Sequence, residues 1–195
     1  MKSEILHLLR HADGYVSGQQ LCETFGVSRT AVWKVINQLK EEGYVIDSVQ
    51  NKGYRITEYP DIITASEIES LLLDDSGNMQ GICRHIQYFD KTDSTNNQAK
   101  LAAEKNAPEG TLFVAECQTG GRGRRGKTWE SPAGSGIWMS LLLRPDISPE
   151  SASMLTLVLA VAMVDAINEE VQDAKCYVKW PNDIVLNNRK ISGTL

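Results

Sequence analysis

Residues 28–43 restrict most strongly what the N-terminal part of this chain can fold into. Ser28 is a favourable N-cap and Gly43 a favourable terminator, so the segment between them is predicted to be a helix. One face of that helix is apolar at helical spacing and consists of Ala31, Val32, Val35, Ile36 and Leu39. The opposite face is polar but includes a large aromatic side chain, and consists of Thr30, Trp33, Lys34 and Asn37. The apolar stripe is typical of a helix packed on a core, which leaves the other face for solvent or a partner.

This helix is the third of three short helical patterns, and a predicted hairpin follows it. Residues 3–11 and 17–25 form the first two helices, and Gly26 supplies the tight turn before the third. Two β-rich runs, residues 44–50 and 54–57, then flank an Asn-Lys-Gly turn. Three helices followed by a hairpin is the arrangement of a winged helix-turn-helix domain.

DNA binding is the function that this arrangement favours, because a recognition helix presents its N-terminal residues to base edges and phosphates. The predicted DNA contacts are Arg29, Thr30, Trp33 and Lys34 on the helix and Lys52 near the tip of the hairpin. The net charge of −5 argues against nucleic-acid binding by the chain as a whole, but residues 1–60 carry seven basic and seven acidic side chains. A protein-interaction module with a solvated helix face remains the alternative.

Length and composition are those of a globular intracellular protein. The 195 residues suffice for one large domain or two small ones, and 42% hydrophobic with 23% charged residues argues against disorder. Four scattered cysteines without a CxxC motif predict unpaired buried thiols in a reducing cytoplasm. The longest apolar run, residues 154–164, is shorter than the roughly 18 residues of a membrane span, and Glu4, His7 and Arg10 argue against a signal peptide. We therefore expect a cytoplasmic protein that does not enter a membrane.

The chain is expected to divide into a winged helix at residues 1–60, a linker with one short helix at 61–82 and an α/β domain at 83–195. Thr64 and Glu67 form a capping box for the linker helix. The α/β domain has predicted strands at 85–89, 111–116, 136–143 and 176–180, helices at 97–105 and 149–171, and a hairpin over 184–195. Because the helix at 149–171 is apolar nearly all round, we expect it to be buried.

The Gly/Arg loop, residues 121–128, fits two nucleotide-binding patterns by its letters. It matches GxxxxGK[ST] and also GxGxxG, and both patterns require a helix directly after the loop. Pro132, Gly134 and Gly136 follow too closely for that helix to form, which argues against both patterns. The loop still brings glycine N–H groups close to a ligand, together with the charges of Arg122, Arg124 and Arg125. We interpret it as a lid that closes over a phosphate compound, with a basic surface loop for nucleic acid as the alternative.

Polar side chains also lie at the ends of other predicted strands. They are Ser94, Thr95 and Asn96 after the first strand, Gln118 after the second, Asn182 and Asp183 after Pro181, and Lys190 in the final hairpin. Their hydroxyl, amide and charged groups are suited to binding a small polar ligand. Taken one at a time, Ser94 is equally well a helix N-cap and Lys190 a routine exposed lysine.

Together, the Ser-Thr-Asn segment, Gln118 with the Gly/Arg loop, Lys-Trp-Pro-Asn-Asp at 179–183 and Arg-Lys-Ile-Ser-Gly at 189–193 resemble the biotin protein ligases. With the winged helix, the chain is similar to the bifunctional bacterial members, which join a biotin ligase and a biotin-operon repressor. Lipoate ligases share the catalytic fold but are not expected to carry this arginine loop or this DNA-binding domain. The implied fold class is α+β, a winged helix-turn-helix domain followed by a biotin/lipoate-ligase-like mixed α/β catalytic domain.

The resemblance implies a two-step reaction and a role for each group of residues. Biotin and MgATP would give biotinyl-5'-AMP, and a lysine of the biotin carboxyl carrier protein of acetyl-CoA carboxylase would then accept the biotin. The implied biotin-binding residues are Ser94, Thr95, Asn96, Gln118, Arg122, Gly123, Arg124 and Lys190. The implied nucleotide-binding residues are Arg122, Arg124, Arg125, Trp129, Asn182 and Asp183. Lys190 and Arg122 are the implied catalytic residues. Asp183 is an implied contact for the Mg²⁺ of MgATP, and no tightly bound metal is implied.

The same resemblance implies binding partners and a longer catalytic domain. Operator DNA and the carrier protein are the implied partners, with a homodimer when ligand is bound. The family continues beyond the position of Leu195 with further strands and a small C-terminal β-barrel, so we expect an incomplete catalytic domain with poor or no ligase activity. The alternative is a DNA-binding regulator that binds biotin or biotinyl-AMP without turnover.

Overall fold

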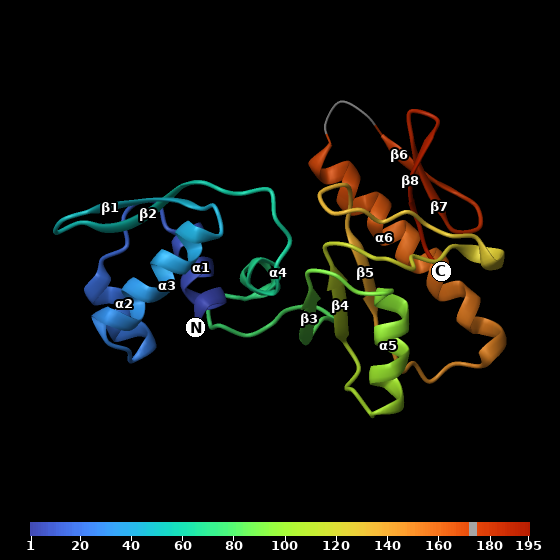
Figure 1. Ribbon diagram of the computed structural model, residues 1–195, viewed down its shortest axis with the longest axis horizontal. Helices are drawn as coiled ribbons and strands as arrows, with labels where there is room; N and C mark the ends of the chain where they lie inside the picture. Colours follow the sequence, from blue (N-terminus) through green and yellow to red (C-terminus); the bar gives the residue numbers. More distant parts are fainter. Residues whose placement is uncertain (172–174) are drawn as a thin grey trace. The chain divides into compact units, whose positions relative to one another are not determined.

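The computed structural model describes residues 1–171 and 175–195 (Figure 1). The chain forms two compact units. The first unit contains Met1–Thr119 and Ser131–Leu142, and the second contains Gly120–Glu130 and Leu143–Leu195. The Gly/Arg loop therefore belongs to the second unit, although in the sequence it lies between two segments of the first.

The N-terminal elements are those of a winged helix. They are α1 (Lys2–His11), α2 (Gly18–Phe25), α3 (Arg29–Glu41), β1 (Val45–Val49) and β2 (Gly53–Glu58). The predicted caps are present, since the Ser17 hydroxyl accepts a hydrogen bond from the Gln20 N–H at 3.0 Å and the Ser28 hydroxyl one from the Ala31 N–H at 3.2 Å. Gly26, with φ of 64°, ends α2 in the left-handed conformation that glycine adopts without strain.

The core of the winged helix closes over the apolar stripe of α3. Val32, Ile36 and Leu39 are each at most 1% exposed, and they pack with buried side chains of α1, α2 and the hairpin. The hairpin is joined to the helices by two backbone hydrogen bonds between Val16 and Tyr54, of 2.8 and 2.9 Å. Gly53 is required at this junction because its φ is 114° and a Cβ there would lie 2.0 Å from the Val16 carbonyl oxygen.

Helix α4 (Ala65–Leu72) packs against α1 rather than standing apart. Thr64 caps it through the Glu67 N–H, as the capping box predicts. Glu67 forms an ion pair with Arg10 at 2.6 Å and accepts a hydrogen bond from the Tyr44 hydroxyl. Burial, followed by the contact with Glu67, raises the pKa of Tyr44 above its ordinary value. The segment expected to be a linker thus carries a helix bound to the winged helix through a partly buried polar cluster.

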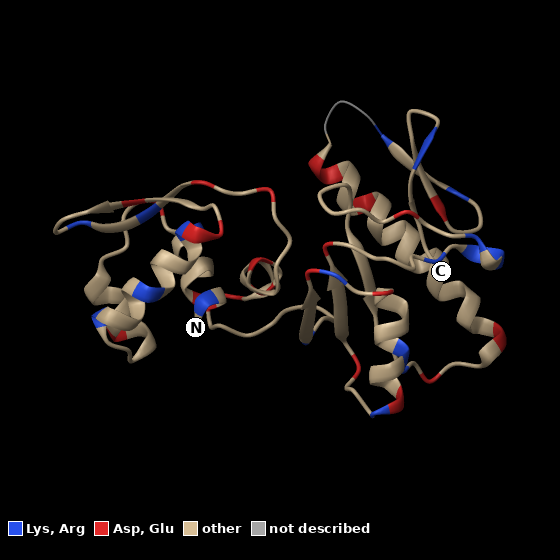
Figure 2. Cartoon of the chain, in the orientation of Figure 1, with Lys and Arg blue, Asp and Glu red and all other residues tan. Residues whose placement is uncertain are grey.

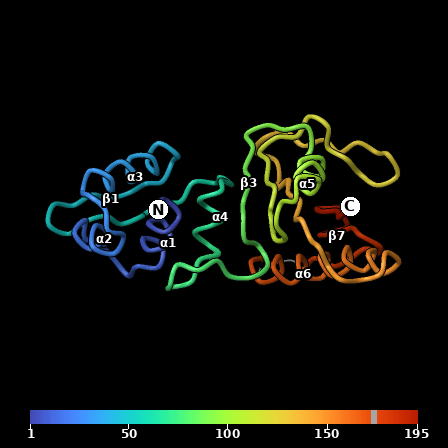
Figure 3. Tube along the Cα trace, turned by 90° about the horizontal axis from the view of Figure 1, so that it is seen from below, coloured from blue at the N-terminus to red at the C-terminus, as the bar shows by residue number. Residues whose placement is uncertain are grey.

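The rest of the first unit is a three-stranded sheet with one helix beside it (Figure 3). Strand β4 (Thr111–Ala115) lies in the centre, parallel to β3 (His85–Phe89) and antiparallel to β5 (Trp138–Leu141). Helix α5 (Thr95–Glu104) packs on β4 and β5. Phe113, Val114 and Ala115 of the central strand are buried.

The second unit combines one long helix with an antiparallel sheet. Helix α6 (Met154–Glu170) follows the short 3₁₀ turn η2 (Pro149–Ser153), and the sheet consists of β6 (Cys176–Lys179), β7 (Asp183–Leu186) and β8 (Arg189–Gly193). The expected final hairpin is present, and its two turn residues, Asn187 and Asn188, both have positive φ, as a tight β-hairpin turn requires.

The prediction that the long apolar helix is buried is wrong. Of the residues of α6, Ala160 alone is buried, whereas Val158 is 63% and Val161 53% exposed. The helix is about 25 Å long, and it packs on β6 and β7, whose four residues each span only about 13 Å. By length and composition, one described helix, Pro149–Glu170, could cross a membrane, but core helices of soluble proteins meet the same criterion.

Candidate functional site

Two of the predicted ligand-binding segments meet in the first unit. Thr95 begins α5 after the short segment that follows β3, and Gln118 lies shortly after the end of β4. The Gln118 side-chain oxygen accepts hydrogen bonds from the Thr95 N–H at 2.8 Å and from the Thr95 hydroxyl at 3.2 Å. Ser94 and Thr95 are 2% and 3% exposed. The structure thus brings together the polar groups that the sequence places at two separate strand ends.

Ser94 occupies the N-cap position of α5 but makes no capping hydrogen bond with its side chain. The preceding residue, Asp93, instead accepts hydrogen bonds from the side chains of Asn97 at 2.6 Å and Gln98 at 2.8 Å. These bonds hold the pKa of Asp93 well below its usual range. The Ser94 hydroxyl is therefore not engaged in capping, which favours the ligand-binding interpretation over the N-cap alternative. Asn96 lies half-buried in the first turn of the same helix.

Two serines that the sequence reasoning missed complete this polar cluster. The Gln118 side-chain nitrogen donates to the Ser131 hydroxyl at 3.0 Å, and the Ser140 hydroxyl lies 2.9 Å from that of Thr95. Ser140 is a polar residue in the otherwise apolar strand β5, and this was the one signal in the sequence. Ser131 offered no such signal, because its role depends on a pairing with Gln118 across 13 residues of chain.

The Gly/Arg loop belongs to the second unit and folds back on itself. Arg122 pairs with Thr128 as an isolated antiparallel bridge, and the Gly123 N–H donates to the Lys127 carbonyl at 2.7 Å. Among the described residues no α-helix follows the loop before α6, which confirms that neither the P-loop nor the dinucleotide pattern applies. Arg122, Arg124 and Arg125 are exposed. The cartoon coloured by residue type shows basic residues close together in this loop (Figure 2).

Lys190 is held by two neighbours within the second unit. Its ammonium group lies 2.7 Å from a carboxylate oxygen of Asp183, on the adjacent strand β7, and 4.8 Å from the centre of the Trp129 ring. Both contacts hold the ammonium group at a defined position. The alternative that Lys190 is a routine exposed lysine is therefore disfavoured, although its side chain remains 37% exposed.

Asn182 connects the loop to the end of the chain. It is 8% exposed, its side-chain oxygen accepts a hydrogen bond from Arg124 at 2.9 Å, and its side-chain nitrogen donates to the Thr194 carbonyl at 2.7 Å. Both polar atoms are thus engaged inside the protein. In the described part of the chain there is no group of three or more His, Cys, Asp or Glu side chains that could hold a metal ion. Asp183 is a single carboxylate, which suits an Mg²⁺ ion that arrives with phosphate oxygens.

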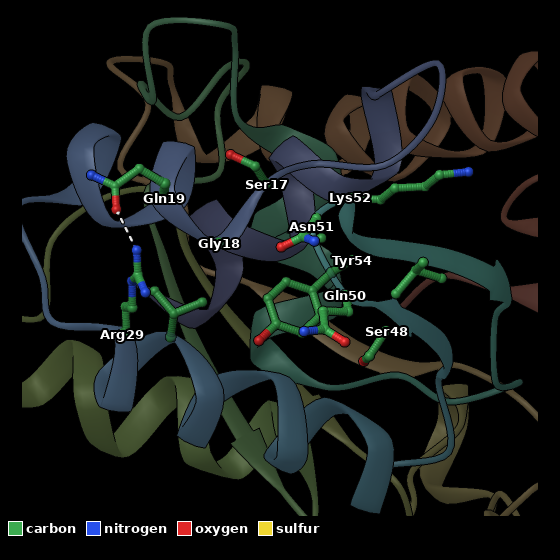
Figure 4. A pocket seen from close by; sticks show the side chains of 12 residues that line it. Ser17, Gly18, Gln19, Arg29, Ser48, Gln50, Asn51, Lys52 and Tyr54 are labelled. Atoms are coloured by element: carbon green, nitrogen blue, oxygen red, sulfur yellow. Dashed lines mark hydrogen bonds between the residues drawn. The ribbon is translucent and has the colours of Figure 1, made fainter.

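The predicted DNA-contacting residues are all exposed on the winged helix. Trp33 is 57% exposed on α3, and Lys52 lies at the tip of the hairpin. A pocket of about 490 Å³ lies between α2, α3 and the hairpin. Figure 4 shows that Gln19 and Arg29 lie on one side of it, joined by a hydrogen bond of 3.1 Å, while Asn51 and Tyr54 come from the hairpin. Thr30 and Lys34 are exposed on the same helix as Arg29.

Two family models match separate parts of the chain. The model of the biotin/lipoate A/B protein ligase family matches residues 88–195, and an HTH domain model matches residues 2–55. The bifunctional ligase/repressor BirA of Bacillus subtilis (strain 168) is 42% identical over 196 residues, covering 100% of this chain. BirA of Escherichia coli (strain K12) is 35% identical over 192 residues, covering 98% of this chain.

A solved structure of biotin protein ligase from Aquifex aeolicus in complex with biotin and ATP is also similar. Its TM-score is 0.50 at 36% sequence identity, over 57% of this chain and 45% of that one. The chain spans 58% of the Bacillus subtilis relative and 56% of the Escherichia coli one. The expected fold class, an N-terminal helix-turn-helix domain before a biotin-ligase-like mixed domain, is confirmed. Because the family model matches more than half of the chain, this protein belongs to the biotin/lipoate A/B protein ligase family.

Proposed function

We propose that this protein is an ATP-dependent biotin protein ligase that also acts as a biotin-responsive repressor. In the first step the biotin carboxylate attacks the α-phosphate of ATP, giving biotinyl-5'-AMP and pyrophosphate. In the second step a lysine amine of the biotin carboxyl carrier protein attacks the acyl carbon, and AMP leaves. The observation that carries the proposal is the position of Lys190, held between Asp183 and the Trp129 ring at the end of the Gly/Arg loop.

The proposed biotin-binding residues lie after the ends of strands and in the Gly/Arg loop. The ureido ring of biotin has both donors and acceptors, which suits the hydroxyls of Ser94 and Thr95 and the amide of Gln118. Asn96 and the backbone of Gly123 complete the proposed biotin contacts. The hydrogen bonds of Gln118 with Thr95 and Ser131 orient its amide before the ligand arrives and leave one N–H of the amide nitrogen for biotin, which supports this assignment.

Adenylation requires positive charge near the carboxylate and the α-phosphate. Arg122 and Arg124 would close over these groups, and the Lys190 ammonium would offset the negative charge that develops on the phosphate oxygens. An ammonium group already held in place needs little reorganisation in the transition state. Lys190 acts here through its charge and forms no covalent bond.

The remaining contacts concern the nucleotide. Arg125 and Trp129 would lie over the adenylate, with Asn182 and Asp183 on its nucleotide side. Because both polar atoms of Asn182 are engaged, its proposed contribution is to hold Arg124. Mg²⁺ would be held by Asp183 together with the phosphates of ATP and would neutralise phosphate charge.

The adenylation step is tested by biotin-dependent exchange of labelled pyrophosphate into ATP. The exchange is measured in the chain extended with the C-terminal part of the Bacillus subtilis relative, because we expect little activity from the 195-residue chain. We expect the Lys190→Ala variant to lose about 10²- to 10³-fold in exchange rate, as is usual when a group that stabilises transition-state charge is removed. Lys127→Ala, which removes an exposed lysine from the Gly/Arg loop, is the control for loss of a lysine charge. Equal exchange by Lys190→Ala and the unsubstituted protein would contradict the proposal.

DNA binding is the second part of the proposal, and the exposed Trp33 beside basic residues of α3 and the hairpin supports it. Operator DNA is the proposed partner, and ligand-dependent dimerisation is proposed to couple biotin supply to repression. Electrophoretic mobility shift with the promoter of a biotin-synthesis operon, with and without biotinyl-AMP, is the test. DNA affinity that persists after residues 1–60 are deleted would contradict it.

A regulator that binds biotin or biotinyl-AMP without turnover is the alternative. It is distinguished by transfer of radiolabelled biotin to carrier protein, measured for the 195-residue chain and for the same chain extended with the C-terminal part of the Bacillus subtilis relative. We expect transfer by the extended chain and little by the 195-residue chain. We also propose a cytoplasmic location, in keeping with the four free cysteine thiols.

A further inference from the structure

We propose that Ser131 is a positioning residue for biotin binding and acts by fixing the side-chain amide of Gln118. The inference rests on the proposed function in one respect, that Gln118 contacts biotin. Ser131 belongs to no motif of the sequence and lies after the Gly/Arg loop, in the segment that returns to the first unit. Its hydroxyl lies 3.0 Å from the Gln118 side-chain nitrogen.

The backbone of Gln118 is held on both sides. It pairs as a parallel bridge with Thr92 and as an antiparallel bridge with Ser131, and its N–H donates to the Ser131 carbonyl at 3.0 Å. Ser131 precedes Pro132, and a residue before proline is restricted to extended conformations, which suit such a bridge. Ser131 therefore meets Gln118 through its backbone and its side chain together.

Both the oxygen and the nitrogen of the Gln118 side-chain amide are hydrogen-bonded, which defines the orientation of the amide. The oxygen accepts from the Thr95 N–H and the Thr95 hydroxyl, and the nitrogen donates to Ser131. A glutamine amide can turn by half a circle and exchange its donor end for its acceptor end. A turned amide would place its NH₂ group against the Thr95 N–H, which is also a donor, so Thr95 selects the orientation. The Ser131 hydroxyl, which can accept or donate, holds the amide in place.

Burial makes the contact with Ser131 matter for the ligand. Ser131 is 3% exposed, so its hydroxyl lies where water competes little for the Gln118 amide. A long glutamine side chain loses considerable rotational freedom when a ligand orders it, and a side chain ordered in advance does not incur that loss on binding. Ser131 thus improves biotin affinity without touching biotin.

Isothermal titration calorimetry of the full 195-residue chain with biotin tests this. We expect Ser131→Ala to raise the dissociation constant about threefold to tenfold, the range of one hydrogen bond between neutral groups. Ser131→Thr keeps the hydroxyl and is expected to restore most of the affinity. Ser135→Ala removes an exposed hydroxyl from the same segment, one that bonds to the Pro132 carbonyl, and is expected to leave the affinity unchanged.

A double-mutant cycle separates positioning through Gln118 from a general structural effect. In a Gln118→Ala background, Ser131→Ala is expected to change biotin affinity by less than about twofold, because the side chain it positions is absent. Thermal unfolding of each variant checks that the fold is kept.

Two results would overturn the inference: an unchanged dissociation constant in Ser131→Ala, or an equal loss with and without Gln118. A failure of the unsubstituted chain to bind biotin would instead refute the proposed function, and it would be visible before any substitution is made.

Discussion

The winged helix and the second unit use apolar sequence in opposite ways. Helix α3 has one apolar stripe, and that stripe is buried by α1, α2 and the hairpin. Helix α6 is apolar nearly all round, yet most of its side chains are exposed. The difference shows that burial depends on how much partner surface a unit offers and not on how apolar a helix is. Three helices and a hairpin enclose a core, whereas three short strands cover part of one face.

The largest loss of stability is expected when a buried side chain in the core of the winged helix is truncated. Leu39→Ala removes a fully buried side chain of α3 and is expected to lower the free energy of unfolding of the winged helix by about 2–5 kcal/mol. Val158→Ala, at a 63% exposed position of α6, is expected to change stability by less than about 0.5 kcal/mol. Urea denaturation followed by circular dichroism measures both. Similar losses at both positions would mean that α6 is covered in solution and would remove the contrast between the regions.

The exposed face of the winged helix is expected to contribute to DNA affinity and specificity. Thr30→Ala is expected to cost about 1–3 kcal/mol on the best operator sequence and little on others, because base contacts carry specificity. Lys52→Ala is expected to weaken binding to all sequences and to lower the salt dependence by about one phosphate contact. Fluorescence anisotropy at several salt concentrations distinguishes the two. Identical sequence preference in both variants would show that α3 does not read bases.

The polar cluster that attaches α4 to the winged helix should make this domain sensitive to high pH. The pKa of Tyr44 is raised in the folded state, so above about pH 10 the unfolded chain loses a proton that the folded chain keeps. Stability from this group is therefore full below about pH 10 and falls above it, by at most about 1.4 kcal/mol per pH unit. Denaturation between pH 8 and 11 should show a shallower decline for Tyr44→Phe. Parallel profiles would mean that Tyr44 does not contribute.

The smallest expected effect concerns the Gly/Arg loop of the second unit. We expect its mobility to change with ligand while the stability of the fold hardly changes. Three glycines and three like charges within residues 121–126 predict mobility without ligand and order with biotinyl-AMP. Limited trypsin digestion at Arg122, Arg124 and Arg125, with and without the adenylate, measures this. Equal cleavage rates in the two states would refute the closing lid.

Local sequence signals anticipated much of the fold. The caps at Ser17, Ser28 and Thr64 and the turn at residues 187–188 depend on neighbours within a few residues, and all are found where they were expected. Alternation and helical spacing likewise located most strands and helices to within a few residues. The rejection of the P-loop also followed from local chemistry, since proline and glycine so close to the loop exclude a helix.

Within the candidate site, the sequence indicated which residues carry suitable chemistry but not how they pair. The hydrogen bonds of Gln118 to Thr95 and Ser131 join segments 23 and 13 residues apart. The contact of Asn182 with Arg124 joins segments 58 residues apart. No periodicity or spacing encodes such pairs, because they arise when strand order and loop path are settled by packing.

The sequence by itself determined the order of elements, the winged helix and the residue types available for binding biotin and nucleotide, because these follow from backbone preferences and side-chain chemistry over short stretches. Tertiary structure decided which polar atoms remain available and which are already engaged. The Ser94 hydroxyl makes no capping hydrogen bond, whereas both polar atoms of the Asn182 amide are bonded. Tertiary structure also decided the exposure of α6, because burial is a property of two surfaces in contact, and the sequence of one helix specifies only one of them.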